Sequence, residues 1–306
     1  MTATPTTAGP TPGTPETIGI PVVSGVHAAP APAAEVPTGW PGTVCGPTGH
    51  DEGGTTVTLP RQGAPVPLAA DLWWVPTGAA NAYLWRDPDG VVVLDPGLPG
   101  EEDVVLDALA RLGGRPQDIA RIVLTHWHSD HSGAAAALAT LTGAEVLAGA
   151  ADAAVLRGES RGTPPDLTED ERPVHEAIAR AAGTVMDAPR IAAARDLHDR
   201  DRLGPGGGAV ARLVGGHTEG SVAVWMAARR AVLTGDLARG TDDGGVAFGL
   251  FHVDRARTAA ALRELAAPDP VVAGFGHGPP ATGSAASALR VASDGVAEGD
   301  GLGEER

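Results

Sequence analysis

The chain contains no lysine: all 22 of its basic residues are arginine, which excludes any chemistry that needs a lysine amine. Cys45 is the only cysteine, so no disulfide can form within the chain. No segment approaches the ~18 consecutive apolar residues of a membrane-spanning helix. Positive charge is absent before Arg61, which disfavours a secretory signal. We therefore expect a cytoplasmic protein.

Acidic side chains outnumber basic ones, 38 against 22, and the formal net charge is −16. Binding to nucleic acid or to an anionic membrane depends on positively charged surface, so neither is an expected partner. Hydrophobic residues make up 42% of the 306 residues, which is enough to bury a sizeable core.

The two ends of the chain have the composition of tails. Residues up to Pro67 contain 13 of the 27 prolines, a density that opposes helices and central strands. We expect residues 1–50 to be disordered or loosely attached, residues 51–290 to form the folded domain, and residues 291–306 to form an acidic, glycine-rich tail.

Between the tails, apolar segments and turn sequences alternate. This pattern predicts strands near 55–59, 71–75, 79–85, 91–94, 122–124, 144–147, 210–214, 221–226, 231–233 and 271–274. Helices are expected near 101–112, 133–141, 150–156, 168–182 and 258–266. An antiparallel start followed by βα units suggests two packed sheets with helices outside. The segment 157–190 interrupts this rhythm and is a candidate cap over a site.

Three histidines and one aspartate fall within six positions of one strand-to-helix turn, in the order His126, His128, Asp130 and His131. In extended backbone, His126 and His128 point to the same side. Imidazole nitrogen and carboxylate oxygen are the ligands that zinc prefers. The alternative is a solvated loop whose histidines bind nothing, but so tight a cluster favours a metal site.

Three more candidate ligands lie on glycine-containing turns at strand ends: His217, Asp236 and His277. Each alone is an ordinary loop residue. Together they supply two imidazoles and a carboxylate at strand ends, where sites in α/β proteins usually form. Two metal sites bridged by one carboxylate would use all seven residues.

The order and spacing of these residues resemble the metallo-β-lactamase-fold hydrolase superfamily, whose hallmark is a His-x-His-x-Asp-His turn followed by separate His, Asp and His. The segments 81–84 and 93–97 resemble the early strands of that family, and the resemblance covers about 70–285. It implies an α/β fold, a four-layer αβ/βα sandwich, with the site along one edge of a catalytic domain at 51–290.

The resemblance also implies the ligand sets. One metal would be held by His126, His128 and His217, the second by Asp130, His131 and His277, with Asp236 bridging both. Two zinc ions per chain are expected, with iron or manganese as alternatives. Asp95 would fix a ligand imidazole by a hydrogen bond or, equally, be a turn residue. His252 would face the cleft or be a surface or packing histidine.

The expected activity is hydrolysis of an ester, thioester, lactone or related small-molecule bond by a metal-bridging hydroxide, with Asp130 also accepting a proton. Departures from subfamily patterns disfavour several substrates. β-Lactamases of this fold usually carry Cys or Ser at the position of Asp236. Glyoxalase II enzymes carry a helical C-terminal domain, for which the residues after His277 are too few. Acyl-homoserine lactonases carry a tyrosine soon after the bridging Asp, whereas the only tyrosine here is Tyr83. RNA-processing relatives need a basic surface.

Two other classes remain open. Persulfide dioxygenases of this fold bind a single iron through residues corresponding to His126, His217 and Asp236, and they retain the other motif residues. A non-catalytic binding protein is the third class, although degenerate members would be expected to lose ligands. The identity of the bound metal would distinguish the hydrolase from the dioxygenase.

Removal of residues 1–50 should leave both the fold and metal binding intact, because this segment has few groups that could join a core. Circular dichroism and elemental analysis of the truncated and full-length proteins check this. A truncated protein that fails to fold or to bind metal would show that the segment is structural.

Overall fold

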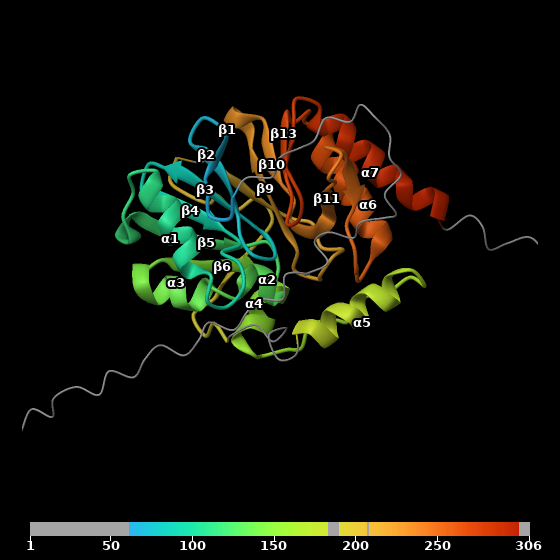
Figure 1. Ribbon diagram of the computed structural model, residues 1–306, viewed down its shortest axis with the longest axis horizontal. Helices are drawn as coiled ribbons and strands as arrows, with labels where there is room; N and C mark the ends of the chain where they lie inside the picture. Colours follow the sequence, from blue (N-terminus) through green and yellow to red (C-terminus); the bar gives the residue numbers. More distant parts are fainter. Residues whose placement is uncertain (1–60, 183–189, 207, 300–306) are drawn as a thin grey trace, which may run out of the picture. The chain divides into compact units, whose positions relative to one another are not determined.

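The computed structural model describes residues 61–182, 190–206 and 208–299, and it shows alternating strands and helices (Figure 1). The expected tail at 1–50 and the expected strand at 55–59 lie outside the described residues. In the described ranges no helix combines the length and the apolar character needed to cross a membrane.

Seven strands form the first sheet in chain order: β1 (Val66–Ala69), β2 (Leu72–Pro76), β3 (Asn81–Asp87), β4 (Gly90–Leu94), β5 (Ile119–Leu124), β6 (Glu145–Gly149) and β7 (Arg195–Leu197). The first four strands are antiparallel, which confirms the predicted meander for β2 to β4. The last four are parallel. Parallel neighbours need crossover connections, which here carry helices α1 (Glu102–Arg111), α3 (Ala135–Thr142) and α4 (Ala150–Arg157).

The second sheet has the strand order β14-β13-β10-β9-β8. Its strands are β8 (Val210–Leu213), β9 (Val222–Met226), β10 (Ala231–Leu233), β13 (Val272–Gly274) and β14 (Ala281–Thr282). The β10 and β13 strands are parallel, and α6 (Arg255–Ala266) lies between them in the chain. A separate pair, β11 (Ala238–Gly240) and β12 (Val246–Phe248), follows β10.

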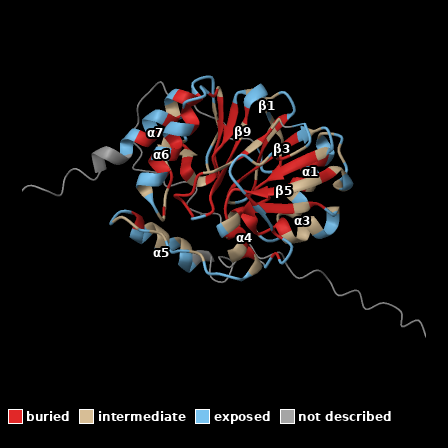
Figure 2. Ribbon diagram, turned by 180° about the vertical axis from the view of Figure 1, so that it is seen from behind, coloured by how far each residue is buried: buried red, intermediate tan, exposed pale blue. Residues whose placement is uncertain are grey.

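Three apolar clusters define four layers. One cluster lies between the two sheets and joins Leu72, Tyr83 and Trp85 of the first to Met226 and Leu233 of the second. A second cluster packs α1, α3 and α4 on the outer face of the first sheet. A third packs α6 and α7 (Ala285–Gly299) on the outer face of the second sheet. Figure 2 shows the buried strands between helices with exposed outer faces. The predicted αβ/βα sandwich is therefore confirmed.

The helix predicted near 133–141 is present as α3, but a short helix that the sequence did not predict comes before it. A short helix, α2 (Ser129–Ser132), comes first, and α3 starts after Gly133 and Ala134. The Ala134 N–H donates to the Gly97 carbonyl at 3.0 Å, so it is diverted from a helical hydrogen bond. Gly133 packs so closely against Pro99 that a Cβ would overlap it. The break orients α2, which carries Asp130 and His131.

The predicted capping box before the 168–182 helix is confirmed. Helix α5 (Glu171–Ala182) begins with Thr168 N–H donating to Glu171 Oε2 at 3.0 Å and Glu171 N–H donating to Thr168 Oγ1 at 3.3 Å. The reciprocal bonds satisfy amides that the first helical turn leaves free.

The expected solvated tail from residue 291 is wrong in its start, because α7 continues to Gly299. Leu289, Ala292 and Ser293 are buried, and the Arg263 guanidinium of α6 donates to the Ser293 carbonyl at 3.2 Å. The acidic residues and Gly295 gave this segment the composition of a tail, but its buried residues recur at helical spacing.

A chain that ends at Arg290 should melt lower than one that ends at Gly299, by about 2–4 °C, which corresponds to a loss of about 1 kcal/mol in a domain of this size. The physical reason is lost burial of Ala292 and Ser293 and the lost hydrogen bond from Arg263. Calorimetry of the two truncated chains measures the difference. Equal melting temperatures would mean that residues 291–299 add nothing to the fold.

Candidate metal centre

The structure brings all seven predicted residues together, each from the segment that follows a strand. His126 and His128 follow β5, and α2 carries Asp130 and His131. The other three follow strands of the second sheet: His217 comes after β8, Asp236 after β10 and His277 after β13. The candidate centre is therefore built from both sheets.

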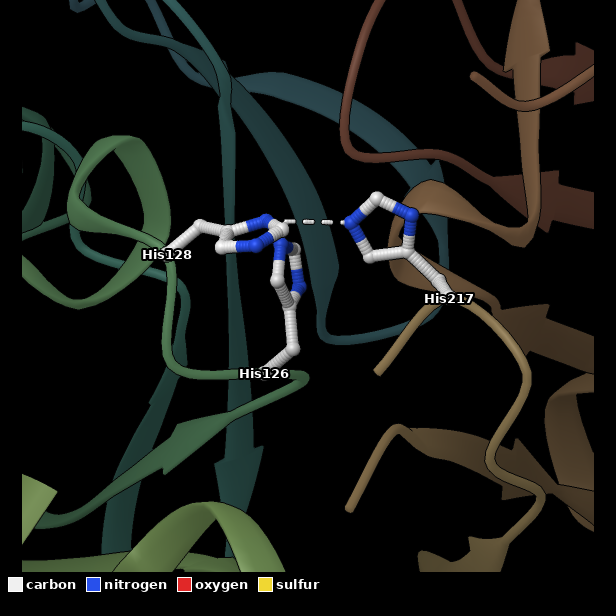
Figure 3. Close-up of side chains that lie close together, drawn as sticks. All are labelled: His126, His128 and His217. Atoms are coloured by element: carbon white, nitrogen blue, oxygen red, sulfur yellow. Dashed lines mark hydrogen bonds between the residues drawn. The ribbon is translucent and has the colours of Figure 1, made fainter. Parts of the chain in front are cut away.

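His126, His128 and His217 form the first group, with one candidate ligand atom from each within 4.8 Å of the others (Figure 3). His128 Nδ1 lies 3.1 Å from His217 Nε2, and the His126 ring centroid lies 4.6 Å from the other two. Burial lowers the pKa of His128 to about 4 and holds the pKa of His126 and His217 well below the usual range. All three imidazoles are thus neutral at pH 7, the form that binds a metal.

Asp130, His131 and His277 form the second group. Asp130 Oδ2 lies 3.3 Å from His277 Nε2 and 3.5 Å from His131 Nε2. Burial opposes protonation of His277, but Asp236 and Asp130 raise its pKa to about 10. His131 follows the same pattern: burial opposes its protonation, and Asp236 and Asp130 raise its pKa well above the usual range. The negative charge of Asp130 and Asp236 that holds these protons can also attract a cation. A metal that binds there would displace the protons from the two imidazoles.

Asp236 stands between the two groups. Its carboxylate oxygens lie 3.3 Å from both His131 Nε2 and His277 Nε2, 3.8 Å from His217 Nε2 and 4.0 Å from His126 Nε2. Burial raises the pKa of Asp236, but His277 and His131 hold it well below the usual range. The Asp236 carboxylate is therefore ionised and lies next to candidate metal-ligating histidines of both groups.

Several buried polar atoms at the centre lack hydrogen-bond partners among the residues that the structure describes: His126 Nε2, His131 Nε2, His217 Nδ1, Asp236 Oδ1 and His252 Nε2. His131 Nε2 and Asp236 Oδ1 are 3.3 Å apart, yet they are not aligned for a hydrogen bond. Leaving such groups unpaired is costly unless another partner satisfies them. Imidazole and carboxylate donors with this arrangement fit a cation such as zinc.

The remaining ring nitrogens of the second group have partners that orient them. Asp95 Oδ2 lies 3.0 Å from His131 Nδ1 and accepts the Thr125 hydroxyl at 2.6 Å, which confirms the predicted contact between Asp95 and a candidate ligand. His277 Nδ1 lies 2.9 Å from the Ala79 carbonyl. Such partners hold an imidazole in one orientation and tautomer.

Two residues of β3 position the turn that carries His277. The Asn81 side-chain amide donates to the carbonyls of Phe275 and Gly278 at 3.0 and 2.7 Å. The Tyr83 hydroxyl donates to the Phe275 carbonyl and accepts the Phe275 N–H, both at 2.8 Å. The chain's single tyrosine is thus buried and engaged away from the reactive atoms.

Sequence reasoning missed Asp152, on α4, which is almost fully buried. It accepts hydrogen bonds from Trp127 N–H, Thr218 hydroxyl and Gly220 N–H, which belong to the two turns that carry the first group. Burial raises the pKa of Asp152 to about 6. The available signal was a lone carboxylate inside an otherwise apolar helix, Ala150–Leu156.

His252 is buried against the centre rather than exposed. Its ring lies 5.4 Å from the His217 ring and 4.5 Å from the Phe248 ring, and Thr258 Oγ1 lies 3.3 Å from its Nδ1. The segment before α5 contacts the same loop, since Asp166 N–H donates to the His252 carbonyl at 2.8 Å. The candidate cap segment is therefore attached beside the histidine that packs on His217.

Residues 75–277 match the family model described as the metallo-beta-lactamase superfamily. Among curated proteins, metallo-beta-lactamase domain-containing protein 1 of Rattus norvegicus is 37% identical over 82 residues, 27% of this chain and 32% of that protein. The uncharacterized protein YobT of Bacillus subtilis is 33% identical over 92 residues, 30% of this chain and 36% of that protein. The matches thus span about a third of these relatives.

Two solved structures share the fold. A metallo-beta-lactamase family protein from Thermus thermophilus has a TM-score of 0.54 at 20% identity, covering 74% of this chain and 80% of that one. The metallo-beta-lactamase SMB-1, solved with mercaptoacetic acid, has a TM-score of 0.57 at 22% identity, covering 78% and 94%. At this level of identity the likeness concerns the arrangement of sheets and helices.

Proposed function

Because the chain belongs to the metallo-beta-lactamase superfamily, we propose that it is a metal-dependent hydrolase of a small molecule with an ester, thioester, lactone or related bond. The observation that carries the proposal is the convergence of buried, unpaired imidazole and carboxylate atoms from both sheets. A purely structural histidine cluster would satisfy those atoms with hydrogen bonds.

The proposed cofactor is a pair of zinc ions. His126, His128 and His217 would hold one ion; Asp130, His131 and His277 would hold the other; and Asp236 would contact both. Two such cations make water acidic enough to act as a nucleophile at neutral pH and polarise the bond to be cleaved. The family match covers all seven residues.

The substrate would approach from the side of Asp130 and His277. Their side chains are 22% and 31% exposed, whereas His126, His131 and His217 are almost fully buried. Asp130 would then have two roles, as a ligand and as the acceptor of a proton from water, because its carboxylate is partly open to solvent. Burial alone would raise the pKa of Asp130, but His131 and His277 hold it well below the usual range.

Elemental analysis of metal-replete protein, combined with a panel of thioester, lactone and phosphoester substrates, tests the proposal. We expect two zinc ions per chain and turnover that chelation abolishes and zinc restores. One iron and no zinc would instead indicate a mononuclear dioxygenase. No bound metal would contradict both functions, and two zinc ions without turnover across the panel would favour a non-catalytic binding protein.

Asp236→Ala and Asp236→Asn should each lose one metal ion and reduce turnover by more than about 100-fold, the upper range for disturbing the support of a metal ligand. The Asp236 carboxylate lies beside candidate ligands of both groups, so its loss affects both sites. Metal content, turnover and melting temperature are measured together, since folding should change little.

Asp242→Asn makes the same chemical change at an exposed turn residue six positions away and serves as the control. It should retain both metal ions and full turnover. If Asp236→Ala also retained two metal ions and near-native turnover, the dinuclear assignment would be wrong even with the fold correct.

A further inference from the structure

Asp152 connects the two turns that carry the three histidines of the first group. Its Oδ2 accepts the Trp127 N–H at 3.1 Å and the Thr218 hydroxyl at 2.7 Å, and its Oδ1 accepts the Gly220 N–H at 2.9 Å. The side chain is 1% exposed, so water does not compete for these bonds. One buried carboxylate therefore binds donors from two turns that are far apart in the chain.

These donors are immediate neighbours of the histidines. Trp127 lies between His126 and His128, and Thr218 directly follows His217. The first group takes two imidazoles from one turn and the third from the other, so its geometry depends on the distance between the turns. The 3.1 Å separation of His128 Nδ1 and His217 Nε2 spans that junction.

The contact between α4 and the second turn leaves no space for adjustment. A Cβ on Gly149, just before α4, would overlap the Gly220 carbonyl, and a Cβ on Gly220 would overlap the Asp152 amide. Glycine at both positions lets the two backbones touch. The carboxylate of Asp152 therefore reaches its donors directly.

Asp152 could be acidic only because it lies in the first turn of α4, but that role does not explain where its hydrogen bonds go. Asp152 is the third residue of α4, where an acidic side chain stabilises the helix dipole. An acid with that role alone would be placed toward solvent or toward the amides of its own first turn. All three hydrogen bonds of Asp152 instead go to the histidine turns.

We propose that Asp152 is a positioning residue that sets the metal affinity of the His126, His128 and His217 group by fixing the distance between its two turns. The inference rests on the proposed function, because it takes this group to be a metal site. It is selective: the second group has other supports, namely Asp95 on His131 and the Ala79 carbonyl on His277.

Chelator competition against zinc-loaded full-length protein tests the inference with Asp152→Ala and Asp152→Asn. Asp152→Ala should bind one of the two zinc ions about 10- to 100-fold more weakly, the loss typical of removing a supporting partner of a metal site. The zinc affinity of Asp152→Asn should lie between those of Asp152→Ala and the natural chain. The side-chain oxygen of Asn still accepts a hydrogen bond, but its NH2 group would face a donor. If Asp152→Ala does not fold, Asp152→Asn carries the test.

Two controls separate positioning from general stability. Asp118→Asn makes the same chemical change where the carboxylate accepts the Arg115 N–H at 2.8 Å, away from the histidines. Leu109→Ala removes a buried side chain from the cluster on the outer face of the first sheet and lowers the melting temperature. Both controls should bind two zinc ions with unchanged affinity.

The outcomes distinguish this inference from the proposed function. Selective weakening of one zinc ion supports the role of Asp152, even if no substrate on the panel is hydrolysed. Unchanged affinity in both Asp152 variants overturns the inference and leaves the hydrolase proposal standing. Equal weakening of both zinc ions, matched by Leu109→Ala, also overturns it. Absence of zinc from the natural chain overturns both.

Discussion

Seven polar side chains converge on one small volume, and the rest of the structure depends on holding them there. Imidazoles and carboxylates removed from water destabilise a fold unless they find partners. Within the described part of the chain, His126 Nε2, His131 Nε2 and Asp236 Oδ1 have no hydrogen-bond partner, while the Nδ1 atoms of His126 and His131 lie within hydrogen-bonding distance of Thr125 and Asp95. The supporting bonds therefore keep the unpaired atoms aimed at a shared point.

That support comes from segments far apart in the chain. Asp95, at the end of β4, joins the Thr125 turn to His131, and Asp152, on α4, joins the turns of both histidine segments of the first group. Close packing adds to these bonds. A Cβ on Gly276 would overlap Asp236 and crowd His131. Position 276 must therefore be glycine for the turn before His277 to pack this closely against the centre.

The fold positions the site but does not choose its chemistry. Strand ends of both sheets supply the ligand candidates, and this arrangement of sheets is shared with solved structures at 20% to 22% identity. Asp130 and His277 are partly exposed, and so is His128 of the first group, whereas His126, His131 and His217 are buried. Under the proposed function, substrate choice would rest with side chains around these partly exposed residues. The loop with His252 lies beside His217, and Asp166, in the segment before α5, donates to the His252 carbonyl.

The sequence by itself determined the features that short segments encode. Spacing from His126 to His131 identified the motif, glycine-bearing turns located His217, Asp236 and His277, and alternation of apolar segments located most strands. The strands, and the segments on which these residues lie, could be predicted because each depends on residues a few positions apart. The short helix α2 and its break from α3 at Gly133 were not predicted, and the break depends on Pro99 and Gly97, which only the folded chain brings near.

Tertiary structure alone decided the role of Asp152 and the length of α7. From its neighbours in the sequence, Asp152 is an ordinary residue of a helix. Its hydrogen bond from the Thr218 hydroxyl, 66 positions away, is visible only in the folded chain. The residues of α7 beyond 291 have the composition of a tail until α6 buries Ala292 and Ser293. In both cases the deciding interaction joins segments whose proximity no local pattern encodes, because hydrogen bonding and burial act between surfaces that exist only once the sheets and helices have packed.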